Sequence, residues 1–307
     1  MEAIDITAVG HALVDIRFIV DRFPGPDEEA VIIKRSYGAG GSAANVAIDI
    51  RRLGLKSAII AKVGFDSFGR LIVDELMKEG VDVSGLRIGF KETGSTTVVI
   101  NSSGRILMYG FKGASEDLKP DEIDTNLISR SKYIHIASLR PDTSIRVASI
   151  AKEYNKIVSW DPGRVLAREG VSKLKELIKL VDIVLANEHE CIDLTKISDY
   201  KEAARKIIDL GPNTVVVKRG HKGIYVVSDE YTGEMPAFKI EKPVDTTGAG
   251  DAFAAGLLTG LARGYDFKKS LIYALAVAAL KVSRLGSHEV PSHNEVIKFI
   301  WEAKYPI

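Results

Sequence analysis

Short runs of apolar residues alternate along the chain with longer segments whose apolar residues recur at helical spacing. The runs are almost continuous, which is typical of strands that helices cover on both faces of a sheet. We expect strands at Ile6–Val9, Ala58–Val63, Tyr133–Ala137, Ile157–Trp160, Ile183–Leu185 and Thr214–Val217. Helices are predicted at Ala43–Leu53, Phe68–Lys78, Ser144–Tyr154, Ser172–Leu180 and Glu202–Leu210. This alternation predicts an α/β fold with a doubly wound, mostly parallel sheet.

Two regions break the alternation, because they have the pattern of strands with no helix between them. They are Arg17–Tyr37 and Ser95–Phe111, and the second contains the hairpin signal Asn101-Ser102-Ser103-Gly104. We expect a small antiparallel sheet, with strands from about residues 15–37 and 95–112, that projects from a single domain spanning residues 1–307. This sheet is expected to serve as a lid or as a dimer surface.

Composition narrows the range of partners. The 307 residues include 42 basic and 41 acidic side chains, a formal charge of +1, which argues against a surface for nucleic acid. The single cysteine, Cys191, excludes an intrachain disulfide and fits a reducing compartment. The N-terminus lacks a signal-peptide pattern, and the most apolar stretch, Leu271–Val282, is too short to span a bilayer. We therefore expect a cytoplasmic protein with no membrane partner.

The most informative motif is Asp-Thr-Thr-Gly-Ala-Gly-Asp at residues 245–251, which leads directly into an apolar helix. The small residues Gly248, Ala249 and Gly250 let backbone N–H groups approach an anion, and the helix start adds a positive end. Asp251, in the first helical turn, is placed to accept the proton of an attacking hydroxyl. The motif therefore favours phosphoryl transfer, which depends mostly on positioning and charge stabilisation.

A second glycine-rich segment, residues 38–45, opens the helix that ends near Leu53. Its glycines allow a ligand to lie against the backbone, and Asn45 offers a donor and an acceptor to a hydroxyl group. Glycine-rich helix starts are common, so this segment alone leaves a purely structural role open.

With these motifs in this order, the chain resembles the ribokinase-like, or PfkB, carbohydrate kinases over nearly its whole length. The resemblance rests on Gly-Gly-x-x-x-Asn at residues 40–45, Asn-Glu-His-Glu at 187–190 and the motif at 245–251. The pattern is closest to archaeal nucleoside and ribosyl kinases. It implies a three-layer α/β/α domain with a β-sheet lid. It also implies Mg²⁺-dependent transfer of the terminal phosphoryl group of ATP, or of ADP, to an alcohol group of a small sugar-type acceptor.

The resemblance also assigns roles to individual residues. It makes Asp251 the catalytic base, with Gly248, Ala249 and Gly250 as the anion hole. It implies substrate binding by Asp15, Gly40, Gly41 and Asn45, and nucleotide binding by Asn187, Lys218, Gly220, Gly223, Thr247, Gly248 and Gly250. Asn187 and Glu190 match the element that organises Mg²⁺ through water. Many relatives bind a monovalent cation near residues 245–247, and the sequence leaves that question open for this chain.

Four cations fall at positions expected to face the site: Arg17, Lys112, Arg140 and Arg164. Together they would repel one another unless they met an anion, and arginine suits phosphate or carboxylate. An anionic sugar such as ribose 1-phosphate is therefore the expected acceptor. Pairing of these cations with acids such as Glu116, Asp142 or Asp161 is the alternative, and it would leave a nucleoside or a neutral sugar as acceptor.

Two other classes of function fit the sequence less well. A non-catalytic ligand-binding protein on a kinase fold is disfavoured, because Asp251 and the Gly248–Gly250 loop are both intact. A nicotinamide dehydrogenase needs a Gly-x-Gly-x-x-Gly fingerprint after its first strand, and Gly10-His11-Ala12 does not supply one.

Overall fold

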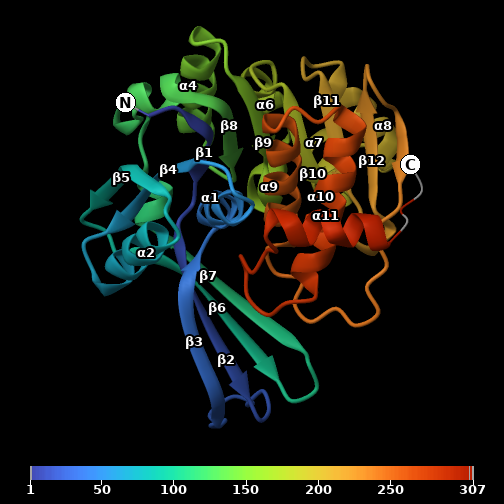
Figure 1. Ribbon diagram of the computed structural model, residues 1–307. Coiled ribbons are helices and arrows are strands. Elements are labelled where there is room, and N and C mark those ends of the chain that lie inside the picture. The colour runs from blue at the N-terminus through green and yellow to red at the C-terminus, as the bar shows by residue number, and fades with distance from the viewer. Residues whose placement is uncertain (1, 304, 306–307) are drawn as a thin grey trace.

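The computed structural model describes residues 2–303 and 305, and its strands form two sheets (Figure 1). The large sheet has nine strands in the order β13-β12-β11-β10-β9-β8-β1-β4-β5. These are β1 Ile4–Gly10, β4 Ser57–Gly64, β5 Asp82–Gly89, β8 Ser131–Ala137, β9 Ile157–Asp161, β10 Ile183–Asn187, β11 Thr214–Lys218, β12 Ile224–Ser228 and β13 Gly233–Met235. All pairings from β5 to β11 are parallel, whereas β12 and β13 are added antiparallel. The prediction of a mostly parallel sheet is confirmed.

Helices cover both faces of this sheet. They are α1 Ser42–Arg52, α2 Ser67–Lys78, α3 Thr125–Arg130, α4 Pro141–Glu153, α5 Gly163–Ala167, α6 Gly170–Ile178, α7 Glu188–Thr195, α8 Tyr200–Ile208, α9 Ala249–Ala262, α10 Phe267–Val282 and α11 His293–Glu302. Short 3₁₀ turns lie at η1 Ala114–Asp117, η2 Pro120–Glu122 and η3 Gly220–Lys222. The five predicted helices correspond to α1, α2, α4, α6 and α8. No helix among the described residues combines the length and apolar character that a membrane span requires.

Successive strand residues belong to two separate cores, one on each face of the sheet. Ile59 of β4 packs in the core formed with α1, α9 and α10, whereas Ile60 packs in the core formed with α4, α6 and α8. This division follows from the two-residue period of side chains along a strand. It explains why the strands have nearly continuous apolar sequences.

The small sheet, here called the lid sheet, has the order β3-β2-β6-β7. Its strands are β2 Leu13–Val20, β3 Ile32–Gly40, β6 Thr93–Asn101 and β7 Ile106–Gly113. It consists of two antiparallel pairs, β2 with β3 and β6 with β7, and the central strands β2 and β6 run parallel. Figure 1 shows these strands extending away from the large sheet. The hairpin predicted at Asn101–Gly104 joins β6 to β7.

Helices α9 and α10 pack closely enough to require a glycine between them. A Cβ atom added at Gly256 of α9 would lie 2.8 Å from the Cα atom of Ala274 of α10. This distance is shorter than van der Waals contact, so any side chain here must separate the helices.

We predict that Gly256→Ala lowers the free energy of unfolding by about 1–3 kcal/mol, the range for overpacked cores. Urea denaturation measures this change. Gly110→Ala in β7 is the matched control, because a Cβ there meets nothing within 4 Å. Equal stability of both variants and the wild type would contradict the prediction.

Candidate active site

The start of α9 is held in place by a backbone turn that precedes it. Gly248, the N-cap residue, has a left-handed conformation with φ 76°, and a Cβ there would lie 1.9 Å from the carbonyl oxygen of Ser287. Asp245 Oδ1 accepts a hydrogen bond from the Thr247 N–H at 2.9 Å, and its Oδ2 accepts one from the Gly286 N–H at 3.1 Å. The first amides of α9, which include those of Ala249 and Gly250, therefore begin at a fixed point with no side-chain cap. Such amides are suited to an anion.

Asp251 lies in the first turn of α9 and contacts the first turn of α1. The Nδ2 atom of Asn45 donates a hydrogen bond to Asp251 Oδ2 at 2.8 Å. Burial, with a further contribution from Asp161, raises the pKa of Asp251 to about 6, against opposing contributions from Asn45 and Lys218. A carboxylate with this pKa is ionised at neutral pH and is a better proton acceptor than an ordinary aspartate.

Lys218, at the end of β11, places a positive charge beside the same helix start. Its ammonium donates a hydrogen bond to Asp161 Oδ2 and lies 3.3 Å from the point that a Cβ of Gly250 would occupy. Burial opposes its charge, but Asp161 and Glu190 outweigh burial and raise the pKa of Lys218. The chain thus provides a permanent cation next to the amides of α9.

Asn187 and Glu190 form a capping box at the start of α7. The Glu190 N–H donates to Asn187 Oδ1 at 2.9 Å, and the Asn187 N–H donates to Glu190 Oε2 at 2.8 Å. Asn187 of β10 is directly opposite Lys218 of β11, and the loop with Gly220 and Gly223 follows β11. The capping box thus stabilises the start of α7 and also lies at the expected nucleotide site.

The donor set in this region fits magnesium held through water. The capping box leaves Glu190 Oε1 and the Asn187 amide nitrogen unused. Burial, followed by the charge of Asp161, raises the pKa of Glu190, so a cation nearby would favour its ionised form. No cluster of three or more His, Cys, Asp or Glu side chains within the described ranges is arranged to hold a metal by itself. Nucleotide phosphates would have to supply the other ligands.

Asp15, Gly40 and Gly41 lie where β2 and β3 of the lid sheet meet α1. A Cβ at Gly40 would lie 2.4 Å from Asp15 Cγ, so the glycine makes room for this buried carboxyl group. Gly41 is the N-cap residue of α1. A cavity of about 290 Å³ opens between the lid sheet and residues 285–289, and Asp15 and Arg17 line it. Ser287, which backs Gly248, lines the same cavity.

The four predicted cations have different surroundings. Arg17 Nη2 lies 3.5 Å from Asp15 Oδ2, and Arg140 forms two hydrogen bonds to Asp142, at 2.6 and 2.7 Å. Lys112 Nζ lies 3.1 Å from His11 Nδ1, whose Nε2 atom is 3.0 Å from Glu116 Oε2. Arg164 lies exposed on α5 and has no ion pair within the part of the chain that is described. Arg17 and Arg140 are thus already paired, whereas Lys112 and Arg164 have no direct carboxylate partner among the described residues.

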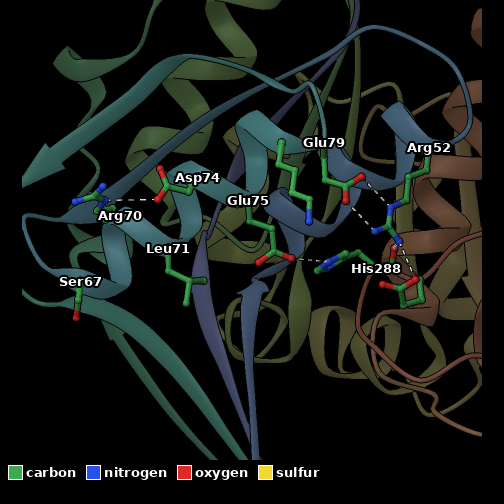
Figure 2. Close-up of a pocket in the computed structure, with 10 residues that line it drawn as sticks. Arg52, Ser67, Arg70, Leu71, Asp74, Glu75, Glu79 and His288 are labelled. Carbon is green, nitrogen blue, oxygen red and sulfur yellow. Dashed lines mark hydrogen bonds and ion pairs between the residues drawn. The ribbon is translucent and has the colours of Figure 1, made fainter.

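A larger cavity, of about 630 Å³, lies away from Asp251 and contains no predicted site residue (Figure 2). Most of its charged groups are paired with one another. Arg52 bonds Glu79 at 2.9 and 3.0 Å, and His288 Nε2 lies 3.0 Å from Glu75 Oε1. Glu75 Oε2 also accepts a hydrogen bond from the Ala39 N–H of β3 at 2.7 Å. We assign this network to anchoring the lid sheet against residues 286–289.

Three further residues near the site were not predicted to belong to it. Ser42, within the glycine-rich segment at 38–45, hydrogen-bonds Asp251. Ser287 backs Gly248, and Lys281 donates to the carbonyl oxygen of Asp245. Only the fold brings Ser287 and Lys281 to the site. His135 lies buried in β8 with Nδ1 2.9 Å from Ser159 Oγ, and burial lowers its pKa to about 4.

Comparison with known proteins agrees with this geometry. The family model described as pfkB family carbohydrate kinase matches residues 3–294. An ATP-dependent ribose-1-phosphate kinase of Halopiger xanaduensis is 35% identical over 97% of this chain and 98% of its own length. A nucleoside kinase of Methanothermobacter thermautotrophicus is 31% identical over 96% of this chain and 94% of its own. The structure of Arabidopsis thaliana ribokinase complexed with ribose and ATP has a TM-score of 0.88 and 25% identity, and covers 99% of this chain and 100% of that one. This chain is an enzyme that belongs to the pfkB family of carbohydrate kinases.

Proposed function

We propose that the chain transfers the terminal phosphoryl group of ATP to an alcohol group of an anionic sugar such as ribose 1-phosphate. The observation that carries the choice of acceptor is the state of Lys112. Its ammonium donates a hydrogen bond to the Nδ1 atom of His11 instead of to a carboxylate, and burial lowers the pKa of Lys112. A phosphate group near Lys112 would restore the stability of its charged form. The 35% identical Halopiger relative, an ATP-dependent ribose-1-phosphate kinase, supports the same acceptor.

In the proposed reaction, Asp251 removes the proton of the acceptor hydroxyl group. The hydroxyl oxygen then forms a bond to the terminal phosphorus of ATP, while the bond from that phosphorus to the bridging oxygen of ADP breaks. The first amides of α9 and the Lys218 ammonium stabilise the negative charge on the transferred group. Asn187 and Glu190 would hold Mg²⁺ through water, and bound Mg²⁺ supplies positive charge to the phosphates.

A nucleoside or a neutral sugar is the second candidate for the acceptor. Ile19, Ile100 and Leu285 line the cavity beside Asp15, and apolar walls suit a base. The pairing of Arg17 with Asp15 and of Arg140 with Asp142 also leaves fewer free cations for an anion. The nucleoside kinase at 31% identity supports this alternative.

Replacement of the proposed base should abolish turnover and spare nucleotide binding. We expect Asp251→Asn to lower kcat by about 10²–10⁴-fold. The pKa of about 6 predicts that the wild-type rate rises as the pH increases through this value and is level above it, because only ionised Asp251 accepts a proton. Steady-state rates from acid to neutral pH test both points, with the exposed acid Asp121→Asn as control. A variant with normal kcat would remove Asp251 from the mechanism.

The anionic acceptor is tested by removing the two cations that lack carboxylate partners. Lys112→Met and Arg164→Ala should each raise KM for ribose 1-phosphate by about 10- to 100-fold, the loss expected for one charged contact. KM for ATP should stay unchanged. Arg168→Ala is the control, because Arg168 is an exposed arginine near Arg164 that contacts Asp193. If the wild type prefers cytidine or ribose and both variants keep this preference, a nucleoside or neutral-sugar kinase replaces the proposal.

We further propose that two copies associate through the lid sheet. Its strands expose Ile32, Ile33, Tyr37, Ile106, Leu107, Met108, Tyr109 and Phe111. Contiguous exposed apolar side chains of this kind mark protein interfaces. The strand register places Tyr37, Leu107, Tyr109 and Phe111 on the face opposite Asp15 and Arg17, and we assign this face to the second copy.

Sedimentation velocity tests the dimer. We expect a wild-type dimer, and monomers for Leu107→Asp and Tyr109→Asp, because a buried unpaired charge opposes association. Met77→Asp, at an exposed apolar position on α2, should remain dimeric. A wild type that is monomeric at all concentrations would contradict this proposal.

A further inference from the structure

A fully buried lysine lies beneath the turn that starts α9. Lys281, on α10, is 0% exposed, and its Nζ atom donates a hydrogen bond to the carbonyl oxygen of Asp245 at 2.8 Å. Burying an ammonium group is costly unless acids or acceptors surround it. Lys281 therefore needs compensation from the groups around it.

Three carboxyl groups from three different elements supply this compensation. They belong to Asp245 in the turn, Asp49 on α1 and Asp251 on α9. Each of them favours the charged form of Lys281 and offsets part of the effect of burial, which, together with Arg17, lowers the pKa of Lys281. Asp49 is also 0% exposed, and neither of its carboxyl oxygens has a hydrogen-bond partner within the described part of the chain. Burial, followed by the charge of Asp251, raises the pKa of Asp49 well above its usual value, and Arg52 and Lys281 oppose this shift.

In the turn at residues 245–248, each of the three oxygens of Asp245 already accepts a hydrogen bond. Its carbonyl oxygen bonds Lys281, its Oδ1 bonds the Thr247 N–H, and its Oδ2 bonds the Gly286 N–H. A monovalent cation placed here would lie beside the Lys281 ammonium and be repelled by it. The residues present therefore do not fit the monovalent cation that the family resemblance implies for this turn.

We propose that the Lys281 ammonium takes the place of a monovalent cation: it holds the Asp245 carbonyl, and through it the phosphate-binding turn that ends at Gly248. Lys281 is then a positioning residue, since it acts on the amides of α9 through Asp245. The inference rests on the proposed role of these amides in binding nucleotide phosphates. The proposal predicts that the enzyme needs no monovalent cation. It also predicts that the turn requires Lys281 to be ordered.

The wild-type protein gives the first test and requires no substitution. Affinity for ATP with Mg²⁺, and hydrogen exchange of the amides at residues 247–251, are measured in potassium, sodium and tetramethylammonium chloride at equal ionic strength. We expect the affinity and the exchange rates to differ by less than about twofold between the three salts. A tenfold change would correspond to about 1.4 kcal/mol. A loss of about tenfold or more when potassium is removed would overturn the proposal.

Lys281→Met provides the second test. We expect faster exchange at residues 247–251 and an affinity for ATP that falls by about 10- to 100-fold, as for loss of one charged hydrogen bond. Potassium or ammonium ions should partly restore both, because they can replace the missing charge. Lys268→Met, at an exposed position of the same helix, should match the wild type. Unchanged affinity and exchange in Lys281→Met, or a loss that neither ion restores, would contradict the proposal.

These measurements separate this inference from the proposed acceptor. Nucleotide affinity and hydrogen exchange are recorded without any acceptor, so a wrong acceptor leaves their interpretation intact. If Lys281→Met does not fold, the cation series with the wild type still decides the question. If the wild type binds no ATP in any salt, the proposed nucleotide role of the turn fails, whereas the exchange of its amides still reports whether potassium orders it.

Discussion

The hydrogen bond between Asn45 and Asp251 joins the first turns of α1 and α9, which are 206 residues apart in the chain. Each helix start follows a segment with a different role. Helix α1 follows β3 of the lid sheet, and α9 follows the turn that Asp245 holds. The bond therefore places the proposed base at the junction of the acceptor side and the phosphate side. The close packing of α9 on α10 at Gly256 keeps this junction in position, because a displaced α9 would move Asp251 away from Asn45.

The charges around Asp251 are balanced in pairs. Asp161 raises the pKa of Asp251, but Lys218 is bonded to Asp161 and limits this effect. Asp49 and Lys281 are also buried, and each favours the charged form of the other, although burial raises the pKa of Asp49 and lowers that of Lys281. Because the acids and the lysines come from separate elements, loss of one partner would leave a buried charge uncompensated. The pKa of Asp251 near 6 is thus a property of the whole arrangement and not of its motif alone.

The sequence predicted the features that depend on local patterns. Apolar periodicity located the central strands and five helices, and the glycine-rich motifs lie where parallel strands end, so their clustering followed from the fold class. Strands β5, β12 and β13 were not predicted, and in β5 the apolar residues are interrupted by Ser84, Gly85 and Arg87. Only some partners of the four predicted site cations could be inferred from the sequence. Arg140 bonds an acid two residues away, whereas Lys112 bonds His11, which is 101 residues distant. Contacts between residues far apart in the chain depend on the fold and cannot be predicted from neighbouring residues.

The groups proposed for acceptor recognition and for phosphoryl transfer lie mostly on different elements. Asp251 and Lys218 lie on α9 and β11, and Arg164 lies on α5, whereas Arg17 and Lys112 lie on strands of the lid sheet. Under the proposed function, substitutions in the lid sheet would change the acceptor while the base and the anion-binding turn stay as they are. Relatives at 35% and 31% identity are a ribose-1-phosphate kinase and a nucleoside kinase, so the acceptor differs among proteins similar to this chain. Glu75 limits the separation, because it bonds both β3 and His288, next to the residue that backs Gly248. The base of the lid sheet is thereby fixed relative to the anion-binding turn. Substitutions that change the acceptor are therefore expected farther along the lid strands.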